Sequence, residues 1–128
     1  MTQKDKELLL KDLCGRLPYG VIVKYRNKDF KLEAIDADSS ELFSDGVYME
    51  LNYDDIKPYL RPLSSMTEKE YEELKSVEPY YGLAPFEYIE DWGPNYEVLD
   101  WLNAHHFDYR GLIKKGLALE APEGMYGS

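Results

Sequence analysis

The sequence predicts an α+β domain in which a small antiparallel sheet of three to five strands has helices packed on one side. Three observations predict this class: an amphipathic segment at the N-terminus, alternating apolar and polar residues between positions 21 and 53, and a helix-capping motif near position 67. The chain has 128 residues, an ordinary size for one domain, and it buries roughly two thirds of its unfolded surface without metals or disulfides. We therefore expect a single domain spanning residues 1–128.

The first expected element is a helix from about Gln3 to Cys14. Thr2 is a preferred capping residue for its start, and Gly15 suits the left-handed backbone that often ends a helix. Cys14 is the only cysteine, which excludes an internal disulfide and predicts a buried structural thiol in a reducing compartment. The buried stripe of the helix is expected to comprise Leu9, Leu10 and Leu13.

The N-terminal segment contains only three consecutive leucines, and charged residues flank them on both sides. Such a run is too short for the core of a signal peptide or for a membrane span. We therefore expect a cytoplasmic protein that does not associate with a membrane.

Three sequential strands, joined as a meander, are expected next. The run from Val21 to Tyr25 is rich in β-branched and aromatic residues, and a corner at 27–29 returns the chain into an alternating strand from Phe30 to Ile35. Residues 36–46 are rich in Asp and Ser and predict a polar loop. The alternation from Val47 to Tyr53 predicts the third strand.

Two prolines, Pro58 and Pro62, predict a short helical turn and an extended connector instead of a regular element. Thr67 and Glu70 then have the spacing of a capping box, which predicts a helix to about Ser76. The buried side of this helix is expected to comprise Met66, Tyr71 and Leu74.

The C-terminal part predicts two further helices and a closing strand. Pro94 suits the first turn of a helix to about Ala104. Asp108 suits the cap of a shorter helix that stops at Gly116. The first of these helices is expected to bury Val98, Trp101 and Leu102, and it is followed later by a short strand at 117–119 and a frayed tail at 124–128.

Tyrosine is the compositional outlier, with 12 tyrosines beside 4 phenylalanines and 2 tryptophans. Tyrosine combines a large apolar face with a hydroxyl that tolerates water, so it is enriched in binding interfaces. Residues 78–94 form a long aromatic loop punctuated by Pro and Gly. These rings either pack inward on the core or bind a partner, and the expected partner-binding residues are Tyr80, Tyr81, Phe86, Tyr88 and Trp92.

The formal charge of −10 is unevenly distributed. Residues 1–28 hold seven Lys or Arg against three acids, whereas residues 29–128 hold eight against twenty-two. Binding to nucleic acid is disfavoured because phosphate neutralisation needs clustered cations. An acidic body instead suits an unidentified protein partner, in particular a basic one, or solubility alone.

The histidine pair is the only candidate for chemistry near neutral pH. His105, His106 and Asp108 are close in sequence and are weak candidates for metal ligands. Adjacent helical residues point about 100° apart and cannot both face one ion, and no zinc motif accompanies them. The sequence also lacks a nucleophile motif and a Gly-rich phosphate loop. We therefore expect packing or capping roles for the histidines, no catalytic residue and no cofactor.

A family resemblance is carried by three blocks of sequence, 8–21, 55–70 and 100–126. They read LLLKDLCGRLPYGV, DIKPYLRPLSSMTEKE and DWLNAHHFDYRGLIKKGLALEAPEGMY. In these blocks the chain resembles a group of small uncharacterised proteins encoded in gut-bacterial genomes, prophages and other mobile elements. The resemblance covers about half of the chain and implies neither an activity nor a functional residue.

Together these observations favour a noncatalytic protein-binding module of phage or mobile-element origin that binds through an acidic, tyrosine-rich surface. One alternative is an acidic mimic of nucleic acid that occupies the basic groove of a DNA-binding or defence protein. The other is a small metal-dependent enzyme centred on His105 and His106. The sequence favours binding over catalysis.

Overall fold

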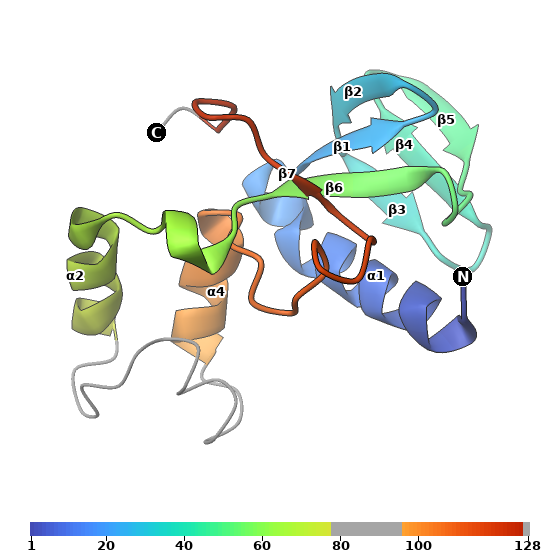
Figure 1. The fold of residues 1–128 in the computed structure, drawn as a ribbon. Helices are drawn as coiled ribbons and strands as arrows, with labels where there is room; N and C mark the ends of the chain where they lie inside the picture. The colour runs from blue at the N-terminus through green and yellow to red at the C-terminus, as the bar shows by residue number, and fades with distance from the viewer. Residues whose placement is uncertain (78–95, 127–128) are drawn as a thin grey trace.

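The computed structural model describes residues 1–77 and 96–126, and it confirms the α+β class. Within these residues the chain forms three α-helices, a four-stranded mixed sheet and a three-stranded antiparallel sheet. Figure 1 shows α2 (Glu68–Val77) and α4 (Tyr96–Ala104) at one end of the molecule and the three-stranded sheet at the other, with α1 (Gln3–Arg16) running from the middle of the molecule to beneath that sheet. Two short 3₁₀ helices are η1 (Leu17–Tyr19) and η2 (Leu63–Ser65).

Helix α1 begins as predicted, because Thr2 Oγ1 accepts a hydrogen bond of 3.1 Å from the backbone N–H three residues on. Its predicted end was wrong: Gly15 lies inside the helix, and the left-handed residue is Gly20 (φ 72°). The prediction of a buried thiol was also wrong, since Cys14 is exposed. Cys14 lies about 100° around the helix from the buried Leu13, which turns its side chain away from the core.

The first sheet begins with the predicted hairpin, formed by β1 (Ile22–Tyr25) and β2 (Lys28–Lys31). Its turn consists of Arg26 and Asn27, which both have left-handed backbone, with φ of 49° and 68°. Two such residues are the geometry that suits a two-residue hairpin. The strand predicted from Phe30 to Ile35 is interrupted, because the chain leaves this sheet after β2 and enters the second one.

The second sheet contains β3 (Ala34–Asp36), β4 (Glu41–Ser44) and β5 (Val47–Glu50) in sequence order. Strand β4 falls within the segment 36–46, so the predicted polar loop was wrong. Leu42 of this strand is 1% exposed and anchors it on the core. The single meander was wrong as well, since its expected strands are divided between two sheets.

The predicted connector around Pro58 was wrong, because Pro58 lies in β6 (Ile56–Leu60), a central strand of the first sheet. Pro58 is opposite Val23 of β1 on one side. On the other side, β7 (Leu119–Glu120) has two residues and pairs in parallel with the two residues that follow Pro58. Because β7 pairs only with residues after Pro58, no described strand on that side would accept a hydrogen bond from the N–H that proline lacks.

The predictions for the end of the molecule that contains α2 and α4 concern helix caps and buried helix faces. The capping box is confirmed: Glu70 N donates to Thr67 Oγ1 (3.1 Å), and Thr67 N donates to Glu70 Oε1 (3.0 Å). Helix α4 buries Val98 and Leu102 as predicted, whereas Trp101 is only half-buried. The helix predicted after Asp108 was wrong, because the Asp108 carboxylate instead closes a turn by accepting hydrogen bonds from the N–H groups four and five residues on.

One apolar core joins α1 to both sheets, and another joins α2 to α4. The predicted fraying of the tail was wrong as far as Tyr126, whose hydroxyl donates to Tyr59 O (2.8 Å) and accepts from Ile22 N (3.0 Å). In the parts of the chain that the structure describes, no helix is both long enough and apolar enough to cross a membrane.

Candidate functional site

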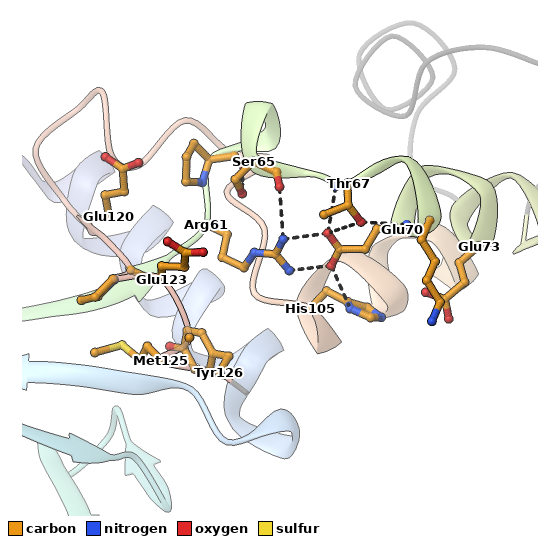
Figure 2. Close-up of a pocket in the computed structure, with 15 residues that line it drawn as sticks. Arg61, Ser65, Thr67, Glu70, Glu73, His105, Glu120, Glu123, Met125 and Tyr126 are labelled. Carbon is orange, nitrogen blue, oxygen red and sulfur yellow. Dashed lines mark hydrogen bonds and ion pairs between the residues drawn. The ribbon is translucent and has the colours of Figure 1, made fainter. Parts of the chain in front are cut away.

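A cavity of about 670 Å³ opens between α2, the segment after β6 and the C-terminal residues 120–126. Figure 2 shows Arg61, Glu70 and His105 together on the helical side, with Glu123 and Tyr126 on the C-terminal side. The cavity wall includes His105, one of the two histidines that were candidates for chemistry near neutral pH.

The central polar contact of the cavity is an ion pair between Arg61 and Glu70. The guanidinium donates two parallel hydrogen bonds, of 2.6 and 2.7 Å, to the two carboxylate oxygens. The same carboxylate accepts the capping bonds from Thr67, and Arg61 stacks over the Phe107 ring at 4.2 Å. The hydrogen bonds from Arg61 outweigh burial and hold the pKa of Glu70 at about 2. Both groups are thus satisfied within the fold, and they join the short segment between β6 and η2 to α2.

The two histidines have different surroundings. His105 lies on the cavity wall, where its Nδ1 is 3.8 Å from Glu70 Oε2 and its ring stacks on Trp101 at 4.0 Å. His106 is buried, has a left-handed backbone (φ 61°) and stacks on Tyr126 at 3.7 Å. Burial, with smaller effects of nearby cations, lowers the pKa of His106 to about 4. The change to left-handed backbone at His106 separates the two rings.

The weak metal candidates are therefore not brought together. The Asp108 carboxylate is buried and accepts two backbone N–H bonds, of 2.8 and 3.0 Å, in its own turn. Within residues 1–77 and 96–126, no three His, Cys, Asp or Glu side chains are arranged so that they could hold a metal ion. The histidines at this end of the molecule instead pack against aromatic rings.

A second polar cluster lies inside the protein, between α1 and residues 107–110. Asp12 and Arg16 are both fully buried and form an ion pair of 2.9 Å. Arg110 donates to the second oxygen of Asp12 (2.6 Å), and Arg16 donates to Phe107 O (2.5 Å). This cluster ties the first helix to residues more than ninety positions later, which is a structural role.

The outer face of the three-stranded sheet has no such internal pairing. Strand register places Asp36, Glu41 and Glu50 directly opposite one another across β3, β4 and β5. All three are exposed, and within the described residues none of them belongs to an ion pair. We refer to Asp36, Glu41 and Glu50 as the acidic row. Hydrogen bonds from Ser39, and one from the backbone of Asp38, lower the pKa of Asp36, which keeps that end of the row charged.

An aromatic row lies beside the acidic row on the same face. The register aligns Ala34, Phe43 and Tyr48, and the two rings lie 4.8 Å apart. The alternate residues, Leu42 among them, pack on the core, so this row points outward. Tyr48 is 71% exposed, and a depression of about 210 Å³ is lined by members of both rows.

The sequence did not identify this face, because it placed Asp36 and Glu41 in a loop. The available signal was the apolar pair Leu42–Phe43 followed by Asp45–Gly46, which is a typical hairpin pattern. The residues expected to bind a partner, Tyr80, Tyr81, Phe86, Tyr88 and Trp92, lie outside the described residues, and their role stays a prediction.

Comparison with known proteins adds no identity to this geometry. No family model, curated protein or solved structure matches the chain.

Proposed function

We propose that this protein is a noncatalytic protein-binding module that recognises a basic partner through the outer face of its three-stranded sheet. The acidic row carries the proposal. Like charges directly opposite one another across strands destabilise a sheet, and none of Asp36, Glu41 and Glu50 forms an ion pair within the described residues. Arg26, whose charge interacts with Glu50, forms its ion pair with Asp55. Cations from a partner would relieve the repulsion within the acidic row. The module acts in the cytosol.

The aromatic row gives this face an apolar contact beside its charges. Tyr48 stands out from the sheet against Phe43. A tyrosine held against a neighbouring ring loses little side-chain entropy on binding, and it offers both an apolar surface and a hydroxyl. The face thus combines acidic side chains with one exposed tyrosine, and the tyrosine-rich segment expected from composition lies outside the described residues.

The other two functions have less support. The metal-dependent enzyme was centred on His105 and His106, and these rings lie in different surroundings with Glu70 already bound to Arg61. A mimic of nucleic acid needs carboxylates along an extended line, whereas three neighbouring strands span only about 10 Å. The acidic row is therefore better suited to a short basic segment of a protein.

The test is affinity capture from the native host with three forms of the full chain. The first is the wild type, and the second removes the acidic row as D36N, E41Q and E50Q. The matched control removes equal charge from three exposed acids around the cavity, as E73Q, E120Q and E123Q.

We expect the wild type and the cavity variant to retain the same basic protein, and the acidic-row variant to lose it. The complex should weaken as salt rises from 0.1 to about 0.5 M, because surface charge pairs are screened. Equal retention by the acidic-row variant would contradict the proposal.

A further inference from the structure

Strand β5 is an edge strand, and its register shows which backbone groups face outward. Leu51 N donates to Ser40 O (2.7 Å), so Leu51 and Ser40 form a hydrogen-bonded pair in the ladder with β4. Hydrogen-bonded and non-hydrogen-bonded pairs alternate along an antiparallel ladder. Met49 therefore points its backbone groups toward β4, whereas Tyr48 and Glu50 point theirs toward the open edge.

Most of these outward groups have no partner in the described residues. The C=O of Glu50 accepts a hydrogen bond from the Tyr25 hydroxyl, which marks the end of the open edge. The N–H of Glu50 and both backbone groups of Tyr48 form no hydrogen bond within residues 1–77 and 96–126. Three backbone groups are thus free to pair with an added strand.

The β5 edge lacks the lysine and proline that protect many edge strands against pairing, and its one charged residue is Glu50. Natural edge strands carry Lys, Pro or bulges that discourage the addition of another strand. Strand β2, an edge of the other sheet, has Lys28 and Lys31 at its ends. Strand β5 has neither Lys nor Pro, and it presents Val47 (55% exposed) and Tyr48 (71% exposed).

We infer that the partner binds as an extended segment that adds a strand to the β5 edge. This inference rests on the proposed function and specifies its ligand. The added strand would continue both rows of the outer face, so it would place an apolar or aromatic side chain beside Tyr48 and a Lys or Arg beside Glu50. Residues on one face of a strand are two positions apart. The recognised pattern is therefore an apolar residue and a basic residue separated by one position.

A second copy of the chain fits this edge poorly. Pairing of β5 with β5 would join the acidic rows of two chains, each with a net charge of −10, on one continuous sheet. A basic segment instead brings opposite charge to the same positions.

The probes are two acetylated and amidated peptides of Ser and Thr, each with one Tyr and one Lys, titrated into the full chain and followed by NMR. In the first peptide Tyr and Lys are two positions apart, and in the second they are adjacent. We expect the first to bind about fivefold more tightly, because only it places both side chains on one face. Equal affinities would overturn the inferred pattern.

Strand addition has a backbone signature that side-chain contact alone does not give. Bound peptide should slow hydrogen exchange at the amides of Tyr48 and Glu50, which face the edge, without a matching change at Met49, which already pairs with β4. Peptide binding that depends on the acidic row but leaves these two amides unprotected would overturn strand addition and leave the proposed function standing. Dimerisation through β5 in the absence of peptide would also overturn the inference.

A proline scan checks the orientation of the edge with matched variants. Y48P removes an outward N–H and is expected to fold. Its affinity for the peptide should be about fivefold lower than that of Y48T, which controls for the loss of the tyrosine side chain. M49P removes an N–H that faces β4 and should lower thermal stability. If Y48P is as unstable as M49P, the assigned orientation is wrong. Y48T itself tests the exchange pattern if Y48P does not fold.

Discussion

Asp12 of α1 and Glu70 of α2 have surroundings opposite to those of the acidic row. Asp12 contacts two arginines, and Glu70 contacts Arg61 and its own helix cap. The acidic row of Asp36, Glu41 and Glu50 is exposed, repulsive and without an ion pair among the described residues. The same residue types thus stabilise one region and destabilise the other. Folding explains the first group, and for the second group we propose binding to a partner as the explanation.

The comparison extends to how the two regions are held together. Outside the three-stranded sheet, polar contacts join distant parts of the chain: Arg110 binds Asp12, and Tyr126 binds Ile22 and Tyr59. The inner side of the three-stranded sheet makes apolar contacts with α1 and the first sheet, and two side-chain hydrogen bonds add to them, from Tyr25 to Glu50 O and from Ser44 to Lys31 O. On its outer face the Asp36 carboxylate accepts hydrogen bonds from the backbone N–H groups of Asp38 and Ser39, whereas Glu41 and Glu50 form no ion pair within the described residues.

The largest expected effect is the loss of the buried carboxylate in D12N. This change leaves Arg16 buried without its counter-ion, and it should lower the free energy of unfolding by about 3–5 kcal/mol. Urea denaturation measures the difference. The control E7Q lies on the same helix at an exposed position and should change stability by less than about 0.5 kcal/mol. A loss below about 1 kcal/mol in D12N would show that the cluster is not structural.

The next effect is a pH dependence from His106. Its pKa is about 4 in the folded protein, against an ordinary value of 6.5. The unfolded chain therefore binds more protons between these values, so stability is fully present above pH 6.5 and falls as pH drops toward 4, by up to about 3 kcal/mol. Glu70, with a pKa of about 2, adds a separate loss below about pH 4.5.

The variant H106N tests this assignment, since Asn tolerates left-handed backbone and does not titrate. We expect its stability to be nearly constant between pH 6.5 and about 4.5. The control Y126F keeps a ring stacked on the imidazole and should keep the wild-type slope. An unchanged slope in H106N would assign the pH dependence to another group.

A smaller loss of stability is expected when the Tyr126 hydroxyl is removed, because this group binds the C-terminal residues to the first sheet. Y126F leaves Ile22 N without its acceptor and Tyr59 O without its donor. An unsatisfied buried group costs roughly 1–3 kcal/mol, and we expect a loss near the lower end because Tyr126 is only half-buried. Thermal unfolding of Y126F at pH 7 gives the value. No change in midpoint would mean that water replaces the hydroxyl.

The sequence predicted the local features well and the long-range ones poorly. The Thr2 cap, the Thr67–Glu70 capping box and the first hairpin depend on residues within a few positions of one another, and all three were found. The division into two sheets depends on the point between β2 and β3 at which the chain leaves the first sheet for the second. No local sequence pattern indicates that point. Pro58 was misread because its place in a central strand depends on β7, sixty residues later.

The candidate site was missed for a similar reason. Composition drew attention to acids and tyrosines, but the alignment of Asp36, Glu41 and Glu50 exists only through cross-strand register. The histidine pair drew attention by adjacency, and a single left-handed residue, His106, sent the two rings to different environments. Sequence alone contains no clear signal for that change of backbone.

The most direct test of the contrast is the stability of E41Q, which neutralises the centre of the acidic row. We expect urea denaturation to show a gain of roughly 0.2–1 kcal/mol over the wild type at low salt, because one charge repelled by two neighbours is removed. The gain should shrink in 0.5 M NaCl as the repulsion is screened. A loss of stability in E41Q would contradict the account, since it would place the acidic row among the charges that hold the fold together.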